Sequence, residues 1–170
     1  MSDTDNGKSA PKKVYVASPM GFSEATRSYM NEVVLPMLRE LGLEIIDPWA
    51  LTPKREMLPG LAISDYHLRQ QELKKLRFVI GERNAIGIAN ADFLVANLDG
   101  QEMDSGSASE IGAASVLKKP IFAWCSDFRQ SGELGAVVNL QVEYFILSSN
   151  GSISGDLHEL QQALRTYLGL

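Results

Sequence analysis

Two carboxylates, Asp104 and Glu110, have the residue types and the spacing that best suit chemistry in this sequence. They are six residues apart in a segment rich in small residues, DSGSASEIG. Small residues allow a ligand to approach the backbone N–H groups at the start of a helix. A carboxylate placed in the first turn there can act as a nucleophile, and a second one can accept or donate a proton. The segment therefore predicts carboxylate chemistry on a small ligand.

The same segment also has a purely structural interpretation. Ser107 and Glu110 match the spacing of a capping box, in which Glu110 returns a hydrogen bond to the first residue of a helix. Asp104 is then only a turn residue. The residues alone leave both interpretations open.

Composition limits the class of ligand and partner. The chain has 170 residues, 16 Lys and Arg against 21 Asp and Glu, and a net charge of −5. It therefore lacks the basic footprint that nucleic-acid binding requires. A single cysteine, Cys125, excludes an internal disulfide and a thiolate zinc cluster, and we expect no metal and no cofactor. Without a long apolar run or an apolar signal segment, we expect a cytoplasmic protein with no membrane partner.

The elements that must position the carboxylates alternate along the chain. After a flexible tail at residues 1–12, residues 13–170 read as one domain. Apolar runs predict strands at 14–17, 43–47, 93–98, 121–124 and 144–147. Helical spacing predicts helices at 25–41, 64–91, 106–117 and from Asp156 onward, with residues 48–63 and 126–138 as loops. The order predicts an α/β fold: a three-layer, flavodoxin-like or Rossmann-like parallel sheet with helices on both faces.

In such sheets the ligand lies beyond the carboxyl ends of the strands. The loops to examine are therefore residues 15–22, 47–49, 97–110 and 125–139. The first of them contains neither G-x-G-x-x-G nor G-x-x-x-x-G-K-[ST], so a dinucleotide or a P-loop nucleotide is poorly supported.

Residues 84–124 read NAIGIANADFLVANLDGQEMDSGSASEIGAASVLKKPIFAW. This block strongly resembles the nucleoside 2-deoxyribosyltransferase family, whose pattern runs A-D-x-x-V-A-x-L-D-G, then D-x-G-[TS]-x-x-E-x-G-x-A, then K-P. The start of the chain, VYVASPMGF, resembles the family's first strand. The resemblance extends over about residues 13–147.

The resemblance implies a role for each matching residue. Glu110 occupies the nucleophile position and would attack C1′ of a 2′-deoxynucleoside, so that a glycosyl ester carries the sugar until a second base or water takes it. Tyr15 matches the tyrosine that holds this carboxylate, and Asp104 the carboxylate that binds the sugar hydroxyls. Asn139 resembles an asparagine that reaches the 5′ end of the sugar from a neighbouring subunit. The resemblance thus implies a homo-oligomer built from dimers.

Asn84 occupies a position where many bacterial members of the family carry an Asp that contacts the base and can supply a proton. An amide can bind a base edge but cannot be a general acid. Gly21, Phe22 and Trp49 can form a base pocket by aromatic stacking, although Trp49 is equally suited to anchor its loop. Asp99 lies at the ligand edge and can orient Glu110 or a ligand. Gly106 and Ser107 are the small residues beside the substrate.

The function expected from these residues is a nucleoside 2′-deoxyribosyltransferase of nucleotide salvage, with deoxynucleosides and free bases as partners. One alternative is a 2′-deoxynucleoside 5′-monophosphate N-hydrolase, for which Ser18, Ser107 and Ser109 could bind the phosphate. The other is a non-catalytic nucleotide-sensing module, against which the set of Tyr15, Asp104 and Glu110 argues. The choice between purines and pyrimidines stays open.

Overall fold

The structure, a computed structural model, describes residues 10–129 and 132–170; residues 1–9 of the predicted tail lie outside them. The strands are Lys13–Ala17 (β1), Glu44–Ile46 (β2), Phe93–Asn97 (β3), Ile121–Trp124 (β4) and Ser152–Ser154 (β5). The α-helices are Glu24–Tyr29 (α1), Leu35–Glu40 (α2), Pro48–Leu51 (α3), Lys54–Leu61 (α4), Tyr66–Asn90 (α5), Ser105–Val116 (α6), Leu140–Leu147 (α7) and Leu157–Leu168 (α8). A π-helical turn, Met30–Val34, joins α1 to α2, and 3₁₀ turns occupy Pro19–Gly21 and Glu133–Gly135.

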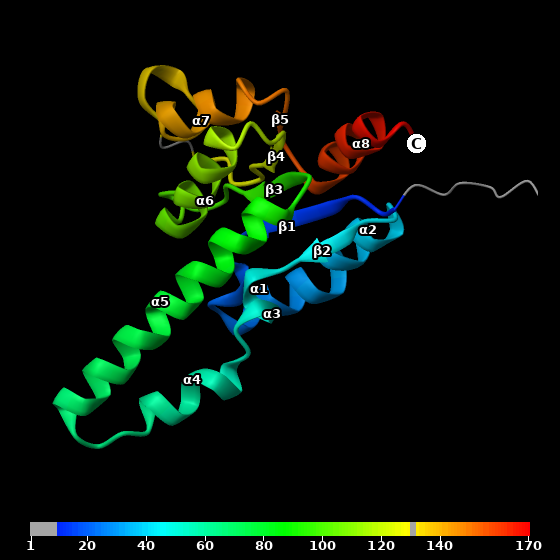
Figure 1. The fold of residues 1–170 in the computed structure, drawn as a ribbon. Coiled ribbons are helices and arrows are strands. Elements are labelled where there is room, and N and C mark those ends of the chain that lie inside the picture. Colours follow the sequence, from blue (N-terminus) through cyan, green and yellow to red (C-terminus); the bar gives the residue numbers. More distant parts are fainter. Residues whose placement is uncertain (1–9, 130–131) are drawn as a thin grey trace, which may run out of the picture.

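The described strands form one parallel sheet in the order β2-β1-β3-β4-β5 (Figure 1). Tyr15 of β1 pairs with Ile46 of β2 on one side and with Leu94 of β3 on the other. The strand order therefore reverses between β1 and β3, and ligands of such sheets bind in the crevice at this reversal. The topology confirms the flavodoxin-like α/β fold.

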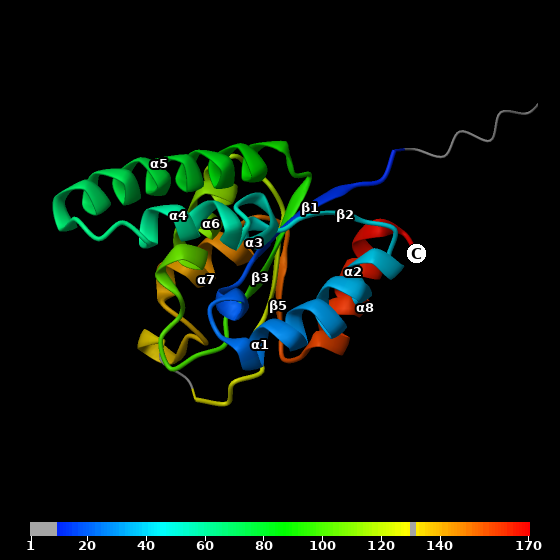
Figure 2. The same ribbon diagram turned by 90° about the horizontal axis from the view of Figure 1, so that it is seen from below.

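Helices lie on both faces of the sheet (Figure 2). Alternating side chains of the strands belong to the two cores on these faces. Val14 and Val16 belong to one core, with residues of the π-helical turn, α2 and α8. Tyr15 and Ala17 belong to the other core, with residues of α5, α6 and α7. The three predicted layers are therefore present, and Tyr15 points into the layer that carries α5 and α6.

The strand predicted at residues 144–147 is wrong, because these residues form the end of α7. Asn139 caps this helix, and its buried residues Val142 and Ile146 are four apart, which is helical rather than strand spacing. The last strand is instead the short, polar β5, Ser152–Ser154. A short apolar run fits a buried strand and one face of a helix equally well.

The loop predicted at residues 48–63 is also wrong, because it contains α3 and α4. Two of its three prolines occupy helix starts, since Pro48 is the first residue of α3, after the cap Asp47, and Pro53 caps α4. The third, Pro59, lies inside α4. A proline at the start of a helix loses no hydrogen bond.

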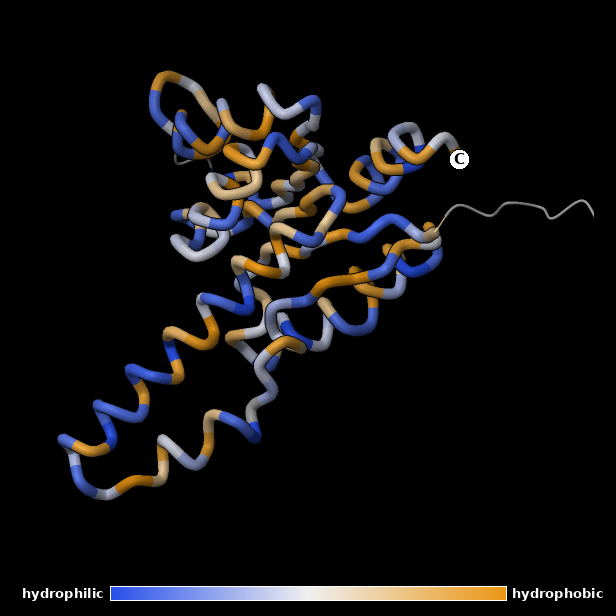
Figure 3. Tube along the Cα trace, viewed as in Figure 1, coloured by the Kyte–Doolittle hydropathy of each residue, from blue (hydrophilic) through white to orange (hydrophobic). Residues whose placement is uncertain are grey.

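Helices α4 and α5 form an arm, Lys54–Asn90, that extends from the body of the protein (Figure 1). Helix α5 is continuous through Gly81 and Gly87. Gly87 and Ile88 are the only buried residues among those described in the arm. Hydrophobic segments recur along it (Figure 3), with exposed side chains from Leu58, Leu61, Tyr66, Leu68, Phe78, Val79 and Ile86. None of the described helices is long and apolar enough to span a bilayer.

Candidate active site

A tyrosine and a glutamate, 95 residues apart in sequence, meet beside the carboxyl end of β1. Tyr15 is fully buried, and its hydroxyl donates a hydrogen bond of 2.7 Å to Oε1 of Glu110. Glu110 lies in the second turn of α6, one turn later than the sequence predicts. The helix is capped by Asp104 and not by Ser107, so the capping-box interpretation of Glu110 is wrong. The carboxylate is therefore left for a ligand.

Helix α5 packs closely against the sheet beside this pair, and a glycine allows this approach. A Cβ atom at Gly87 would lie 3.1 Å from the Tyr15 ring and 3.0 Å from Ile46, so only a glycine fits there without displacement. Asn84 is almost one turn before Gly87 and therefore faces the same way. Its Nδ2 donates to Oε1 of Glu110 over 3.4 Å.

The surroundings of Glu110 disfavour the ionised form of its side chain. Burial raises its pKa to about 7, the Tyr15 hydrogen bond lowers the pKa, and the nearby Asp104 carboxylate raises it. Burial and the Glu110 charge also raise the pKa of Tyr15, which keeps Tyr15 a hydrogen-bond donor. Both described donors bind the same oxygen of Glu110, Oε1. A desolvated carboxylate with one oxygen so held and the other available suits a nucleophile.

Asp104 fixes the start of α6. Its Oδ2 accepts hydrogen bonds from the backbone N–H of Ser107 at 2.8 Å and from the Ser107 hydroxyl at 3.0 Å. A Cβ at Gly106 would lie 3.0 Å from this same oxygen. These contacts occupy one carboxylate oxygen of Asp104. The residue also borders the cavity described next.

A cavity of about 270 Å³ opens above Glu110. The part of the cavity wall that α3, α4 and α5 supply is mostly apolar. The lining residues are Ser18, Phe22, Pro48, Trp49, Thr52, Met57, Ile80, Asn84, Asp104, Gly106, Ser107 and Glu110. Such a cavity, with a few convergent polar groups at one end, suits a small ligand with a polar and a flat part.

Trp49 is held firmly in the apolar wall. Its indole Nε1 donates to the carbonyl of Ser18 at 3.0 Å, and its ring meets Phe22 edge-on, with the ring centroids 4.6 Å apart. A Cβ at Gly21 would lie 2.1 Å from the Trp49 ring, so Gly21 supports the ring and does not itself line this cavity. Phe22 is 72% exposed and forms the rim. Trp49 thus has both of the roles considered for it, because it anchors its loop and also lines the cavity.

Several lining residues were not predicted from the sequence. Thr52 and Met57 lie in the segment that was expected to be a loop, and nothing in their residue types marks them. Ile80 is four residues before Asn84 on the same helix, so helical spacing could have found it. Arg83 does not line the cavity but braces its wall, because it donates to the Leu51 carbonyl, to Thr52 and to Glu56.

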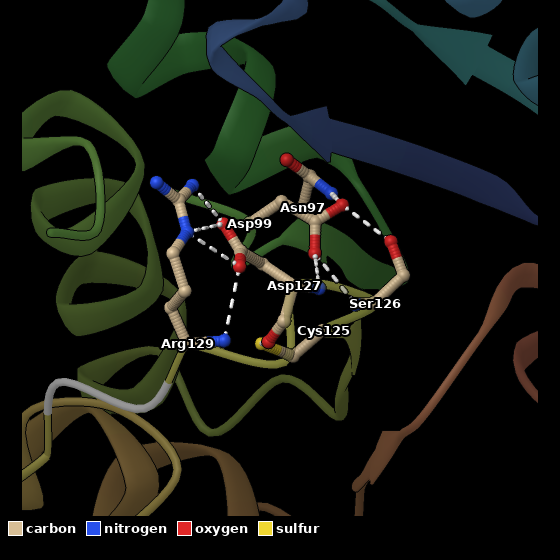
Figure 4. Close-up of polar contacts among 6 residues, drawn as sticks. All are labelled: Asn97, Asp99, Cys125, Ser126, Asp127 and Arg129. Carbon is tan, nitrogen blue, oxygen red and sulfur yellow. Dashed lines mark hydrogen bonds and ion pairs between the residues drawn. The ribbon is translucent and has the colours of Figure 1, made fainter. Parts of the chain in front are cut away.

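The structure does not bring Asp99 to the cavity. Its carboxylate instead accepts hydrogen bonds from both the backbone and the hydroxyl of Ser126, from the backbone of Asp127, and from Asn97 (Figure 4). These contacts tie the end of β3 to the loop after β4. Asp127 forms an ion pair with Arg129, which lowers the pKa of that carboxyl. Asp99 thus holds a loop in place.

Asn139 also lies apart from Glu110. It lines a larger cavity of about 760 Å³ on another side of the first turn of α6, together with Ser105 and Arg129. Its Oδ1 accepts from the backbone N–H of Gln141, and the residue is exposed. Within one chain, Asn139 and Glu110 thus line different cavities. Among the described residues, no three His, Cys, Asp or Glu side chains gather as they would to hold a metal ion.

A model of the nucleoside 2-deoxyribosyltransferase family matches residues 14–151. The chain belongs to this family. A search of curated proteins found no match. The resemblance that rests on Asn84–Trp124 and on the first strand is thereby confirmed at the level of the family.

Several solved structures have the same fold as this chain. A conserved protein from Enterococcus faecalis V583 is 25% identical, with a TM-score of 0.67, over 93% of this chain and 99% of that chain. A 2-deoxyribosyltransferase from Bacillus psychrosaccharolyticus is 22% identical, with a TM-score of 0.59, over 92% and 95%. A CMP N-glycosidase from Clostridium botulinum is 20% identical, with a TM-score of 0.53, over 92% and 99%. The family and the last two of these neighbours, by their names, comprise enzymes that transfer or hydrolyse glycosyl groups.

Proposed function

We propose that the protein is a nucleoside 2′-deoxyribosyltransferase that exchanges the bases of 2′-deoxynucleosides through a covalent deoxyribosyl–Glu110 intermediate. The observation that carries this proposal is the desolvated Glu110 carboxylate, held by Tyr15 at the polar end of the cavity. Its free oxygen, Oε2, attacks C1′ as the bond from C1′ to the base breaks and its electron pair leaves with the base. The sugar is then an ester of Glu110, and a second base attacks C1′ to release it.

Tyr15 and Asn84 orient Glu110 by binding its Oε1. The transition state resembles an oxocarbenium ion, and the negative charge of Glu110 stabilises this developing cation. Asp104 binds sugar hydroxyls with the oxygen that its cap leaves free. The base packs among Phe22, Trp49 and the other apolar residues of the wall.

The charges around the cavity favour nucleosides over nucleoside monophosphates. Its lining residues include two carboxylates, Asp104 and Glu110, and no Lys or Arg. Two of the three serines that could bind a phosphate already donate their hydroxyl hydrogens, Ser107 to Asp104 and Ser109 to the Gly106 carbonyl. Ser18 accepts from the Met20 N–H and keeps its own hydrogen. A 5′-phosphate would thus meet negative charge and few free donors.

The protein forms a homo-oligomer in this proposal, and Asn139 serves the site of a neighbouring subunit. This assignment is supported by the place of Asn139 in a different cavity from Glu110 of its own chain. The exposed apolar side chains of the arm supply a surface for such assembly.

The decisive experiment is mass spectrometry of the protein after incubation with a 2′-deoxynucleoside alone. The expected result is a gain of one deoxyribosyl group on the peptide that contains Glu110, and the loss of this gain when a free acceptor base is added. Formation of a new nucleoside with the acceptor base supports transfer. Release of free deoxyribose at the same rate with and without acceptor, or a requirement for the 5′-phosphate, identifies a hydrolase instead.

A further inference from the structure

One side chain joins the three helices that supply the apolar wall of the cavity. Arg83 lies on α5, and its Nη1 donates to the Leu51 carbonyl at 2.9 Å and to Oγ1 of Thr52 at 3.3 Å. The same nitrogen donates to Oε2 of Glu56 at 2.7 Å and forms an ion pair with it. Leu51 ends α3, Thr52 follows it, and Glu56 lies in the first turn of α4. One guanidinium group therefore connects α5 to the end of α3 and to the start of α4.

Apolar packing holds this part of the wall only weakly. Among the described side chains of α3 and α4, none is buried. Thr52, between the two helices, is the buried residue of the segment, with 6% of its surface exposed. A segment with few buried contacts opens at little cost in free energy unless other contacts hold it. Hydrogen bonds from a charged donor are stronger than neutral ones, and Arg83 makes them at three successive points of this segment.

The same helix also contacts the nucleophile at the opposite end of the cavity. Asn84, the next residue of α5, donates to Oε1 of Glu110 at 3.4 Å. Helix α5 is continuous, so the contact with Glu110 and the contact with the wall are made by neighbouring residues of one rigid element. Trp49 of α3 and Met57 of α4 both line the cavity. Their distance from Glu110 therefore depends on the contacts that Arg83 makes.

We infer that Arg83 is a positioning residue that sets the size of the base accepted by the site. The inference rests on the proposed function and adds what limits its substrates. Arg83 is not among the residues that line the cavity, so it acts through Trp49, Thr52 and Met57. While the wall is held in place, a bulky base must displace it to bind. Without the Arg83 contacts the wall can move outward, so that a small base loses contacts and a bulky base gains room.

The test measures base exchange with small and bulky acceptor bases. Adenine is compared with N6-benzyladenine, and cytosine with N4-benzylcytosine, in the wild-type protein and in Arg83→Met, whose side chain is apolar and has no donor. We expect kcat/KM for the better parent base to fall at least ~5-fold, as loss of charge-assisted hydrogen bonds predicts. The change should appear in KM, with kcat within about threefold of the wild-type value, because the wall contacts the base in substrate and transition state alike.

The preference for the parent base over its benzyl derivative is the readout that a general loss of structure would not move. It should shrink at least ~5-fold in Arg83→Met, whereas partial unfolding lowers both rates by one factor and leaves their ratio unchanged. Glu56→Gln, at an exposed position, removes only the charge of the partner and should move the ratio the same way by a smaller factor. Arg77→Met, exposed on the same helix, makes the same change in charge and should leave the ratio unchanged. An unchanged ratio in Arg83→Met would overturn the inference.

Hydrogen exchange distinguishes failure of this inference from failure of the proposed function. If the wild-type protein transfers no base, the proposed function is wrong and the selection of bases by size is wrong with it. The hold of Arg83 on the wall is then decided without a substrate. We expect the amide hydrogens of residues 48–61 to exchange at least ~5-fold faster in Arg83→Met, and those of β3 to keep the wild-type rate. Faster exchange limited to the wall supports the positioning role. Equal rates in both proteins, or faster exchange throughout the chain, overturn it.

Discussion

Two carboxylates near the carboxyl end of the sheet, Glu110 and Asp99, have opposite hydrogen-bonding environments. Asp99 accepts hydrogen bonds on both oxygens, from Asn97, Ser126 and Asp127. Glu110 has its described donors on one oxygen only, and burial raises its pKa to about 7. Both residues belong to the same sequence motif, and they differ in desolvation and in the distribution of donors around them.

The difference shows what separates a structural carboxylate from a reactive one. A carboxylate whose lone pairs are all used ties two segments together and has nothing left for a substrate. One that is partly desolvated and half-satisfied is less stable as an anion and therefore gains more from an electrophilic partner. The comparison predicts that the same change, carboxylate to amide, has unrelated effects at the two positions.

The largest expected effect is on catalysis at Glu110. Glu110→Gln removes the proposed nucleophile while preserving shape, and base exchange should fall by about 10⁴-fold or more, as for other covalent nucleophiles. Steady-state assays by chromatography measure this, with circular dichroism as a check on folding. Asp99→Asn is the matched control, with kcat within about threefold of the wild-type value. A large loss from Asp99→Asn together with a small one from Glu110→Gln would reverse the assignment.

Tyr15→Phe should have the next largest effect. Loss of a charge-assisted hydrogen bond of about 1.5–3 kcal/mol should slow exchange about 10- to 100-fold. The acid limb of the pH profile should also move. Activity needs ionised Glu110, so in the wild-type protein it rises with pH through about 7. Because the Tyr15 hydrogen bond lowers this pKa, the limb of the variant should lie at higher pH. An unmoved limb would show that Tyr15 does not bind the carboxylate in solution.

Stability should decrease on substitution at Asp99. The backbone N–H groups of Ser126 and Asp127 share one oxygen of Asp99, which the amide of Asp99→Asn can keep. Its NH2 group then faces two donors, Asn97 Nδ2 and Ser126 Oγ, at a cost of about 1–3 kcal/mol. Urea denaturation at pH 8 measures the free energy of unfolding. No loss of stability would mean that the loop after β4 does not depend on this clamp.

The smallest effect is a gain of stability at Glu110. Its pKa in the folded protein exceeds the ordinary value of 4.5, so the folded state binds more protons than the unfolded state between these values. Stability therefore falls as pH rises from about 4.5 to about 7. Glu110→Gln removes this penalty and should raise Tm by a few degrees at pH 8 but not at pH 4. Equal shifts at both pH values would assign the gain to something other than charge.

Sequence reasoning worked where local and tertiary signals agree. The apolar run at residues 93–98 contains the fully buried parallel strand Phe93–Asn97, and the order of elements around it sets the sheet and the edge where ligands bind. Residue types and spacing alone pointed to Glu110, with a capping box as the alternative, whereas Tyr15 was predicted only through resemblance to a family. Nothing in their spacing of 95 residues indicates that a hydroxyl from β1 reaches α6.

The failures have a common physical cause. The residues of α7 form an apolar run whose period cannot be read over so few positions, and the polar residues of β5 give no strand signal. Ser107 and Glu110 have the spacing of a cap, yet Asp104 begins the helix and leaves Glu110 facing the sheet. Asp99 matched the family pattern, but its partners come from the loop after β4. In each case the local pattern is too short to decide which structure or contact forms.

Because the side chains of the arm are mostly exposed, the proposed activity should depend on the concentration of the protein. Met57 and Ile80 form part of the cavity wall, yet the helices that carry them bury almost nothing of their own. Segments with so few buried contacts open readily, and their amide hydrogens exchange rapidly. A neighbouring copy that covers the arm would slow this exchange and set the shape of the cavity at the same time. Dilution would then lower the turnover of each chain before any part of the central sheet unfolds.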